Sequence, residues 1–290
     1  MLRKRVVKTM YNLVLKEYLN LKEYKYYSSP IKTDEDRIKP KKKRRAGSED
    51  DFECRYKWVS YNPFTGERLE EGLFLTADVE DEETKYYMSV LSSYRRTRRM
   101  IFDLCMSNLW EYFVTFTFAE DKVDRYDYEE CSKKMANWIN NVKKKFAPDI
   151  KYVVVPEQHK DGAWHFHGVF ANVGDMTFLD SGRKDKHGRV IYNLYEYKFG
   201  FTTATYITDN MATCLYIQKY ITKDLCGNLY NKKRYWCSRN LDKPKIEKRM
   251  YRNGLEEFEN SLVTEDYRSN KVQGEFYDVY QYLIYTTNTD

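Results

Sequence analysis

The sequence predicts an α+β fold, a mostly antiparallel sheet with helices on one side. Residues 112–118 (YFVTFTF) are β-branched or aromatic throughout, which is typical of a buried strand. Residues 128–146 repeat apolar side chains at helical spacing, which predicts an amphipathic helix with one side facing a core. Four strand-like segments and another helix follow before residue 223, and strands joined by short turns pair in antiparallel fashion.

Two regions of different character precede this core. Residues 1–52 are expected to be loosely organised, with one early helix and then a polar, basic linker. Residues 54–74 have the pattern of a hairpin whose turn is Asn62–Gly66. The segment 81–108 is expected to be helical.

Turn signals separate the elements that follow residue 118. Pro156 is expected to end a strand at 150–155, because proline cannot donate to the ladder of backbone hydrogen bonds. The polar turn Gln158–Gly162 leads into a strand over Ala163–Ala171. Asp209 is suited to cap a helix that runs to about Thr222. The two remaining strands are expected at 190–198, after a turn at 186–188, and at 201–207, so the sheet has about five strands.

These elements divide the chain into four parts. A basic, loosely structured extension covers residues 1–52, and a hairpin with an arginine-rich helix covers residues 53–110. The predicted sheet lies in residues 111–240. Residues 241–290 form a C-terminal extension with a helix and a strand.

Composition excludes several classes of protein. Charged residues make up 32% of the 290, and mean hydropathy is −0.81. No apolar run approaches the roughly 20 residues that span a bilayer, so no membrane association is expected. The N-terminal residues have no secretory signal pattern, and the six cysteines include no CxxC pair, which indicates reduced thiols in a cytoplasm. The wide spacing of Cys214, Cys226 and Cys237 disfavours a zinc site.

The positive charge is concentrated in short runs. The net charge of +6 is a weak signal by itself. One run comprises Lys39, Lys41, Lys42, Lys43, Arg44 and Arg45, and a second comprises Arg95, Arg96, Arg98 and Arg99. Each run alone is compatible with a solvated face, and the first also with a localisation signal. Because aromatic residues reach 17% of the chain, the mixture suits a surface that contacts phosphates and stacks on unpaired bases.

Three of the four histidines fall in the segment PEQHKDGAWHFHGVF, residues 156–170. On a strand, His165 and His167 project to the same face, while Trp164 and Phe166 point to the other. Two neutral imidazoles and a carboxylate can bind one divalent cation and leave positions open for substrate. Glu157 is the expected third ligand because the turn returns it beside His165, although Gln158 and His159 are also within reach. His187, in KHGR, is better explained as a surface residue.

A second chemical feature is CLYIQKYITKD, residues 214–224. On a helix, Tyr216 and Tyr220 lie one turn apart on one face, and Lys219 and Lys223 have the same relation on a neighbouring face. A phenol has a pKa of about 10 and is far more acidic than a sugar hydroxyl. It can therefore attack a polarised phosphate, and a nearby ammonium stabilises the charge that develops. Two of the 28 tyrosines could also share a helix face by chance and simply pack in a core.

Together the two features resemble the HUH endonucleases. HFH at 165–167 is similar to their metal-binding motif, YIQKYITK at 216–223 to their two-tyrosine motif, and YFVTFTF to their first motif strand. The longer strings PEQHKDGAWHFHGVF and YITKDLCGNLYNKKRYWCSRNL resemble the replication initiators of microviruses, especially gokushoviruses, and related initiators of bacterial integrative elements. The resemblance covers residues 112–240.

The resemblance implies a ferredoxin-like or RRM-like sheet in a nicking and joining domain at 111–240. It implies Mg²⁺ or Mn²⁺ held by His165, His167 and a third ligand, and cleavage of single-stranded DNA by Tyr216 or Tyr220 to leave a 5′-phosphotyrosine. Expected partners are an origin hairpin and a host helicase and polymerase, in the cytoplasm of a bacterial host if a phage encodes the chain. Since the chain contains no GxxxxGK[ST] sequence, it is not expected to carry its own helicase domain.

Other classes fit less well. A cupin-type oxygenase needs a glutamate soon after the second histidine, and a metallo-β-lactamase-type hydrolase needs HxHxDH; Gly168 and the residues after it match neither. A relaxase or a transposase of the same superfamily is an alternative, although such a transposase commonly uses one tyrosine. The main rival is a non-catalytic module that binds single-stranded nucleic acid through an RRM-like sheet. Such a module would need neither the histidine pair nor the paired tyrosines.

Overall fold

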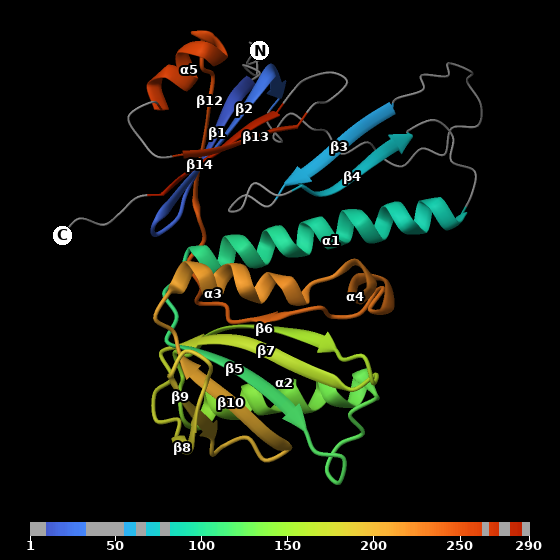
Figure 1. The fold of residues 1–290 in the computed structure, drawn as a ribbon, viewed down its shortest axis with the longest axis vertical. Coiled ribbons are helices and arrows are strands. Elements are labelled where there is room, and N and C mark those ends of the chain that lie inside the picture. The colour runs from blue at the N-terminus through green and yellow to red at the C-terminus, as the bar shows by residue number, and fades with distance from the viewer. Residues whose placement is uncertain are drawn as a thin grey trace, which may run out of the picture. The chain divides into compact units, whose positions relative to one another are not determined.

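The computed structural model describes residues 10–32, 55–61, 68–75, 82–262, 267–272 and 279–285. The chain divides into two compact units: residues 83–243 form one, and residues 1–82 with 244–290 form the other (Figure 1). The basic run at 39–45 and the turn Asn62–Gly66 lie outside the described residues. No helix in the described ranges is long and apolar enough to cross a membrane.

The 83–243 unit contains a mixed set of helices and strands in which every strand pair is antiparallel. Its strands are β5 (Tyr112–Phe118), β6 (Lys151–Gln158), β7 (Trp164–Ala171), β8 (Phe178–Lys184), β9 (Val190–Leu194), β10 (Gly200–Tyr206) and β11 (Trp236–Cys237). Its helices are α1 (Glu82–Met106), α2 (Tyr128–Lys145), α3 (Asn210–Ile217), the 3₁₀ turn η2 (Gln218–Tyr220) and α4 (Lys223–Asn228). These strands, among the described residues, form one sheet in the order β11-β6-β7-β5-β10-β9-β8.

The predicted α+β class and the antiparallel sheet are therefore confirmed, but the count of about five strands is too low. Two strands were missed. β8 is a polar, largely exposed strand, and β11 has only two residues, so neither has the apolar alternation of a predictable strand. The expected strand at 190–198 ends at Leu194.

Helix α2 covers one face of the sheet. Its buried side consists of Tyr128, Cys131, Met135, Trp138, Ile139 and Val142. Trp138 packs edge-on against Phe116 of β5 and Phe170 of β7, with ring centroids 4.8 and 6.1 Å away. Asp127 caps the helix by accepting a hydrogen bond from the Glu129 backbone N–H. The predicted amphipathic helix and its core face are thus confirmed.

The opposite face of the sheet is also covered, so the expectation of helices on one side is wrong. Helices α3 and α4 lie over this second face, and α1 lies over them (Figure 1). Tyr86 of α1 donates a hydrogen bond to the Gly227 carbonyl of α4, and the Cys214 thiol of α3 donates to the Cys105 carbonyl of α1. The second face is polar in part, since it carries the histidine pair, and a polar strand face gives no sequence signal that a helix will cover it.

Two predicted element ends are corrected. β6 continues through Pro156, which pairs with Phe166, because β11 pairs only with Val153 and Val154 and the strand edge beyond them tolerates a missing N–H. The helix expected to run to Thr222 ends at Ile217 and is followed by η2. Ile221 and Thr222 are extended, and Thr222 caps α4 by accepting a hydrogen bond from the Leu225 backbone N–H. These two β-branched residues interrupt what periodicity alone predicts as one helix.

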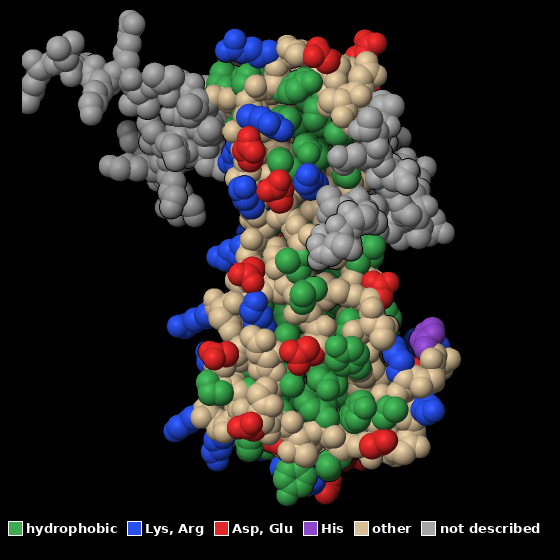
Figure 2. All heavy atoms as spheres, turned by 90° about the vertical axis from the view of Figure 1, so that its left-hand side faces the viewer, with side chains coloured by type: hydrophobic (Ala, Val, Ile, Leu, Met, Phe, Trp, Pro, Cys, Tyr) green, Lys and Arg blue, Asp and Glu red, His purple; other side chains and the backbone are tan. Residues whose placement is uncertain are grey.

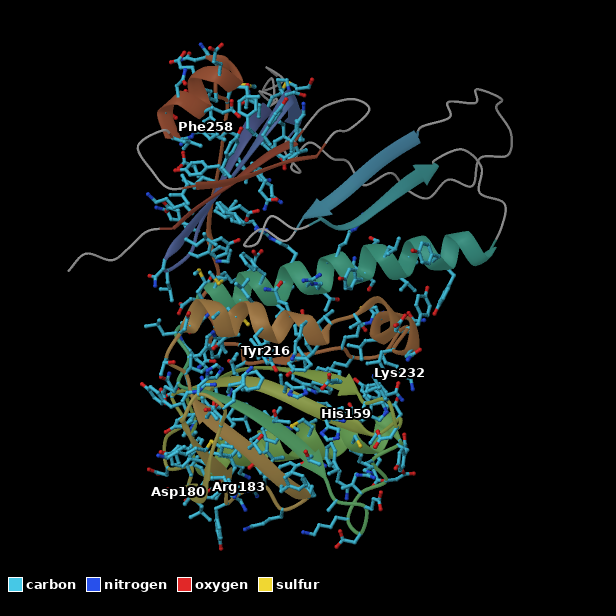
Figure 3. The ribbon with its side chains drawn as sticks, viewed as in Figure 1. His159, Asp180, Arg183, Tyr216, Lys232 and Phe258 are labelled. Carbon is cyan, nitrogen blue, oxygen red and sulfur yellow. The ribbon has the colours of Figure 1, made fainter. Side chains whose placement is uncertain are left out.

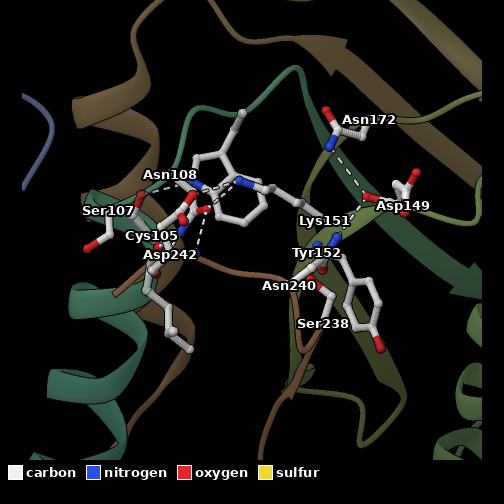
Figure 4. A network of polar contacts seen from close by, with 12 residues as sticks. Cys105, Ser107, Asn108, Asp149, Lys151, Tyr152, Asn172, Ser238, Asn240 and Asp242 are labelled. Carbon is white, nitrogen blue, oxygen red and sulfur yellow. Dashed lines mark hydrogen bonds and ion pairs between the residues drawn. The ribbon is translucent and has the colours of Figure 1, made fainter. Parts of the chain in front are cut away.

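A buried network ties the end of α1 to the sheet (Figure 4). The Asn108 side chain, 1% exposed, donates to the carbonyls of Leu104 and Asp242 at 2.8 and 3.0 Å. Its oxygen accepts from Lys151 Nζ of β6 at 3.0 Å, and Lys151 also contacts the Asp242 carboxylate at 2.8 Å. The network fixes the position of α1, which in turn supports the helices above the histidine face.

Aromatic rings also pack at the other end of the sheet. Tyr112 stacks on Phe178 of β8 at 4.0 Å and meets the rings of Tyr192 and Tyr206 edge-on. Figure 2, viewed from the side on which β8 and β9 lie, shows hydrophobic side chains gathered on this face of the unit. Tyr206 is 54% exposed there, so this end of the sheet has an aromatic surface.

The second unit brings the two ends of the chain together. Its described strands are β1 (Met10–Glu17), β2 (Leu21–Lys32), β12 (Lys245–Arg249), β13 (Tyr267–Val272) and β14 (Val279–Tyr285), paired in the order β12-β1-β2-β14-β13. Helix α5 (Gly254–Leu262) packs Phe258 against Tyr26 and Tyr282. A separate hairpin, β3 (Arg55–Tyr61) with β4 (Arg68–Leu75), confirms the predicted one. The helix and loose linker predicted for residues 1–52 are wrong for 10–32, which form strands.

Candidate active site

The histidine pair lies on β7, in the interior of the sheet. His165 and His167 face the α3 side, while Trp164 and Phe166 are buried on the α2 side, as the alternation predicted. Across β5, Thr117 pairs with His165 and Thr115 with His167; across β6, Glu157 pairs with His165. Strand register therefore places two imidazoles, two hydroxyls and one carboxylate on one surface.

The threonines orient the imidazole rings. Thr117 Oγ1 lies 3.2 Å from His165 Nδ1, and Thr115 Oγ1 lies 3.1 Å from His167 Nδ1. Because each Nδ1 is held by a hydroxyl, each Nε2 is left for a ligand or an acid. Sequence reasoning missed these two residues. The signal was present in YFVTFTF, where the threonines alternate with the same period of two as the histidines.

Glu157 holds the centre of the cluster. Its Oε2 lies 2.6 Å from His167 Nε2 and 3.4 Å from His159 Nε2. His159 stacks on His165, with ring centroids 3.7 Å apart and planes within 4°. The structure thus brings Glu157, His159, His165 and His167 together, whereas Gln158 instead contacts the Gly162 carbonyl and Asn228.

The protonation states suit cation binding. Burial, with the neighbouring imidazoles of His159 and His167, lowers the pKa of His165 to about 4. Burial also lowers the pKa of His167, although Glu157 opposes this. Burial alone would raise the pKa of Glu157, but its hydrogen bond to His167 and the nearby positive charges outweigh that effect and lower it. Neutral imidazoles beside an ionised carboxylate are the forms that a divalent metal takes as ligands.

The donor atoms do not yet converge on one point. Within the described part of the chain, no three His, Cys, Asp or Glu side chains are arranged to hold a metal ion. The reason is local: Glu157 Oε2 bonds directly to His167 Nε2 and occupies the direction that a metal would take. The donor set itself, two oriented imidazoles and a carboxylate that is 33% exposed, fits a divalent cation once Glu157 rotates.

Tyr216 and Tyr220 lie above the histidines. Tyr216 is in the last turn of α3, between that helix and the sheet (Figure 3), and Tyr220 is in η2. The Tyr220 hydroxyl donates to the Tyr216 oxygen at 3.1 Å. Tyr220 stacks on His167, with centroids 3.7 Å apart and planes within 5°, and Tyr216 meets the ring of Phe113 edge-on. The two predicted sequence features therefore form one cluster.

The two tyrosines differ in environment. Tyr216 is 46% exposed and Tyr220 is 6% exposed. Burial would raise the pKa of Tyr216, but hydrogen bonding to Lys219 and Tyr220 and the Lys219 charge outweigh it, so the pKa is lowered. Burial and the hydrogen bond to Tyr216 raise the pKa of Tyr220. The exposed phenol is thus the better nucleophile.

Lys219 is the lysine that the structure places at the tyrosine pair. Its Nζ lies 3.7 Å from the centre of the Tyr216 ring and 4.7 Å from that of Tyr220. It is positioned to stabilise negative charge on either phenolate. Lys223, the other predicted lysine, begins α4, and its side chain lies outside the described part of the structure.

A cavity of about 770 Å³ opens beside Tyr216. Its lining includes Phe113 of β5, Thr205 of β10, Thr213 of α3, and Lys186 and His187 from the turn between β8 and β9. Aromatic, hydroxyl and cationic groups therefore surround a space of nucleotide size next to the nucleophile. His187 is exposed, as predicted, but it also lines this cavity, which its isolated position in the sequence does not indicate.

The arrangement has the parts of a phosphoryl-transfer site that uses a tyrosine nucleophile. Residues 111–225 match the model of the family described as replication-associated protein ORF2/gene II protein, a family of phage replication initiators. Replication proteins of the gene II type are nicking endonucleases. The matched segment contains β5, β7, α3 and η2, and hence the histidine and tyrosine clusters. No significant match was found among curated proteins, and none among solved structures.

Proposed function

We propose that this protein is a single-stranded DNA endonuclease and strand transferase of the HUH type that initiates rolling-circle replication of a small phage or mobile-element genome. The family match supports the role in replication. The observation that carries the proposal is the packing of both tyrosines over the histidines, with the hydroxyls 3.1 Å apart and Tyr220 stacked on His167. A core-packing tyrosine pair would have no need of Lys219 or of an exposed phenol.

Tyr216 acts first in this proposal. Its oxygen attacks the scissile phosphorus, the bond to the 3′-oxygen breaks, and that oxygen takes a proton to become a free 3′-OH. The DNA stays attached as a 5′-phosphotyrosine, which conserves the energy of the phosphodiester for rejoining. Lys219 stabilises the phenolate before attack and the phosphoryl oxygens during it.

Tyr220 acts second. In the structure it is buried and hydrogen-bonded to the oxygen of Tyr216. When the Tyr216 oxygen becomes part of a phosphodiester it loses its negative charge, and the Tyr220 hydroxyl lies next to the phosphorus that it would attack in a second cleavage. Paired tyrosines of this kind favour a replication initiator over a transposase that uses one tyrosine.

His165, His167 and Glu157 are the residues that would hold Mg²⁺ or Mn²⁺, with His159 as the alternative to Glu157. When bound, the cation would neutralise charge on the phosphate and polarise it toward attack. The nucleotide beside the scissile phosphate would occupy the cavity lined by Phe113 and Tyr216. The DNA partner is an origin hairpin, and a host helicase and polymerase in a bacterial cytoplasm would complete replication.

The test is formation of a covalent adduct. The purified chain is mixed with labelled single-stranded DNA carrying a candidate origin hairpin and Mn²⁺, and an SDS-resistant species is sought on a gel. We expect an adduct that EDTA prevents. Tyr216→Phe should slow its formation by about 100-fold or more, whereas Tyr220→Phe should spare the first cleavage and impair joining.

Binding of the same DNA, measured by fluorescence anisotropy, serves as the control and should be unchanged in both variants. An adduct that persists in the Tyr216→Phe, Tyr220→Phe double variant would show that the nucleophile is elsewhere. DNA binding without any adduct, across a panel of origin hairpins, would support the rival non-catalytic module.

A further inference from the structure

A basic cleft lies in the 83–243 unit, apart from the tyrosine and histidine cluster. Its volume is about 520 Å³. One wall is a stripe of α1, formed by Ser93, Arg96, Thr97 and Met100 at the spacing of one helix face. The other wall is the segment that leads into β11, with Lys232, Lys233, Arg234, Tyr235 and Cys237. Four cationic side chains and no carboxylate therefore appear among the described residues that line it.

Arg234 fixes the geometry of the cleft. Its guanidinium donates to Ser93 Oγ of α1, to the Cys226 carbonyl at 3.0 Å and to the Leu229 carbonyl at 3.3 Å. These bonds connect the two walls and the end of α4. Because its donors are committed to the protein, Arg234 positions the cleft and is not its principal ligand group.

The remaining cations are available to an anion. Arg96 and Lys233 are exposed, and in the part of the chain that the structure describes neither forms an ion pair with a carboxylate. The other arginines of the run are directed elsewhere: Arg98 donates to the Tyr94 hydroxyl at 2.7 Å, and Arg99 pairs with Asp103 at 3.0 Å. Lys232 pairs with Glu129 at 2.9 Å, but both groups are well exposed, so solvent weakens this pair.

We propose that this cleft binds the phosphodiester backbone of the substrate DNA at a distance from the cleaved bond. The inference rests on the proposed function for the identity of the ligand. Two free cations, two hydroxyls and a rigid frame match the charge and hydrogen-bonding needs of a phosphate chain, and the cleft has no base-reading side chain pattern. It therefore contributes affinity and not sequence choice.

The position of the cleft suits a strand that crosses the sheet. The cleft adjoins β11, the edge strand next to β6, while the cavity at Tyr216 lies toward β10 and the β8–β9 turn. Figure 3 shows Lys232 beside α4, on the side away from Asp180 and Arg183 of β8. The histidines of β7 lie between these two sites in the strand order. DNA held at both sites would place an intervening phosphate over the histidines.

The test uses the full chain and a fluorescein-labelled single-stranded oligonucleotide, with anisotropy measured over a range of salt concentrations. The variant Arg96→Gln, Lys233→Gln should bind about tenfold more weakly and reduce the slope of log K against log salt by about 1.4, because each phosphate contact with a single strand contributes about 0.7. The charge-retaining variant Arg96→Lys, Lys233→Arg should bind like the wild type.

A matched control removes the same charge from the other face of the sheet. Lys144→Gln, Lys145→Gln changes two exposed residues in the last turn of α2 and should leave the salt slope unchanged. An unchanged affinity in the cleft variant, or an equal loss in the α2 variant, would overturn the cleft as a binding site. Because the readout is binding, this result is separate from the adduct test: a chain that forms no adduct can still show or lack the cleft contribution.

Discussion

Each histidine of the proposed metal site faces a threonine across the β5–β7 pair. The hydroxyls bond the Nδ1 atoms at 3.1 and 3.2 Å and so choose which nitrogen faces outward. This is the role that outer-shell partners have in metal sites, where they fix the orientation of the ring and its tautomer. The sequence could predict the histidines from their spacing, but the threonines depend on strand register, which a single sequence does not specify.

Replacing both threonines with valine tests this role. Thr115→Val, Thr117→Val keeps the β-branched shape and removes the hydroxyls, so the fold should persist. We expect the apparent affinity for Mn²⁺, from titration of adduct formation, to fall by about 10- to 100-fold. Circular dichroism and a thermal melt serve as controls for folding. A variant that folds normally and needs no more Mn²⁺ than the wild type would rule out the orienting role.

Tyr197 illustrates a different residue-scale effect in the α2-side core. It is 4% exposed, packs on Phe116 and Trp138, and its hydroxyl has no hydrogen-bond partner among the described residues. Burial, with a small contribution from Cys131, raises its pKa. The neutral phenol is therefore the form that the folded state tolerates.

Tyr197→Phe should leave stability near pH 7 unchanged or raise it by up to about 1 kcal/mol, since an unpaired buried hydroxyl is removed. The wild type has a pKa raised by folding, so its stability is complete below the unfolded value of about 10 and falls as pH rises beyond it. The phenylalanine variant lacks this loss at that site. Urea unfolding at neutral pH and above pH 10 should show the difference growing in its favour, and a constant difference would contradict the assignment.

At the scale of elements, the break between α3 and α4 decides how the tyrosines differ. Periodicity predicted one helix with both phenols on the same face, and the two phenols do come together. The extended residues Ile221 and Thr222 nevertheless end the helical run, and η2 turns Tyr220 down onto His167. Strand and helix positions in 82–206 were largely predictable because their apolar patterns are strong. The break was not, because it depends on packing against β7.

Gly200 is the point at which β10 approaches β5 most closely. It pairs with Phe118, and a Cβ at this position would lie 2.8 Å from the Ala119 nitrogen and closer still to the Thr117 carbonyl. Gly227 of α4 is the opposite case: a Cβ there would lie 3.7 Å from its nearest neighbour, the Tyr86 hydroxyl. Only the first position therefore requires glycine for steric reasons.

Gly200→Ala should lower the free energy of unfolding by about 1–3 kcal/mol or more, because backbone atoms cannot move aside as a side chain can. Gly227→Ala, in a helix, should be neutral or stabilising by up to about 1 kcal/mol. Chemical denaturation of both variants measures the contrast. Equal stabilities for the two would mean that β10 and β5 separate more easily than the structure indicates.

At the scale of the whole molecule, residues from both ends of the chain build one sheet. β1 pairs with β12, and β2 pairs with β14, so strands more than 200 residues apart in sequence are neighbours. Such pairings cannot be predicted from local patterns, which is why residues 10–32 were expected to be a helix and a linker. The 83–243 unit, by contrast, is continuous in sequence and contains every residue of the proposed active site.

This division predicts that a fragment of residues 83–243 folds alone. All strands of its sheet, together with α1 to α4, lie within it, so its core should remain intact. We expect native-like circular dichroism, a cooperative melt, and adduct formation with the same EDTA sensitivity as the full chain. A chain that ends at residue 243 should instead lose the first unit, because β1 and β2 are then left without β12 and β14 and expose strand edges that promote aggregation. An unfolded 83–243 fragment beside a well-folded 1–243 chain would reverse this assignment of the two units.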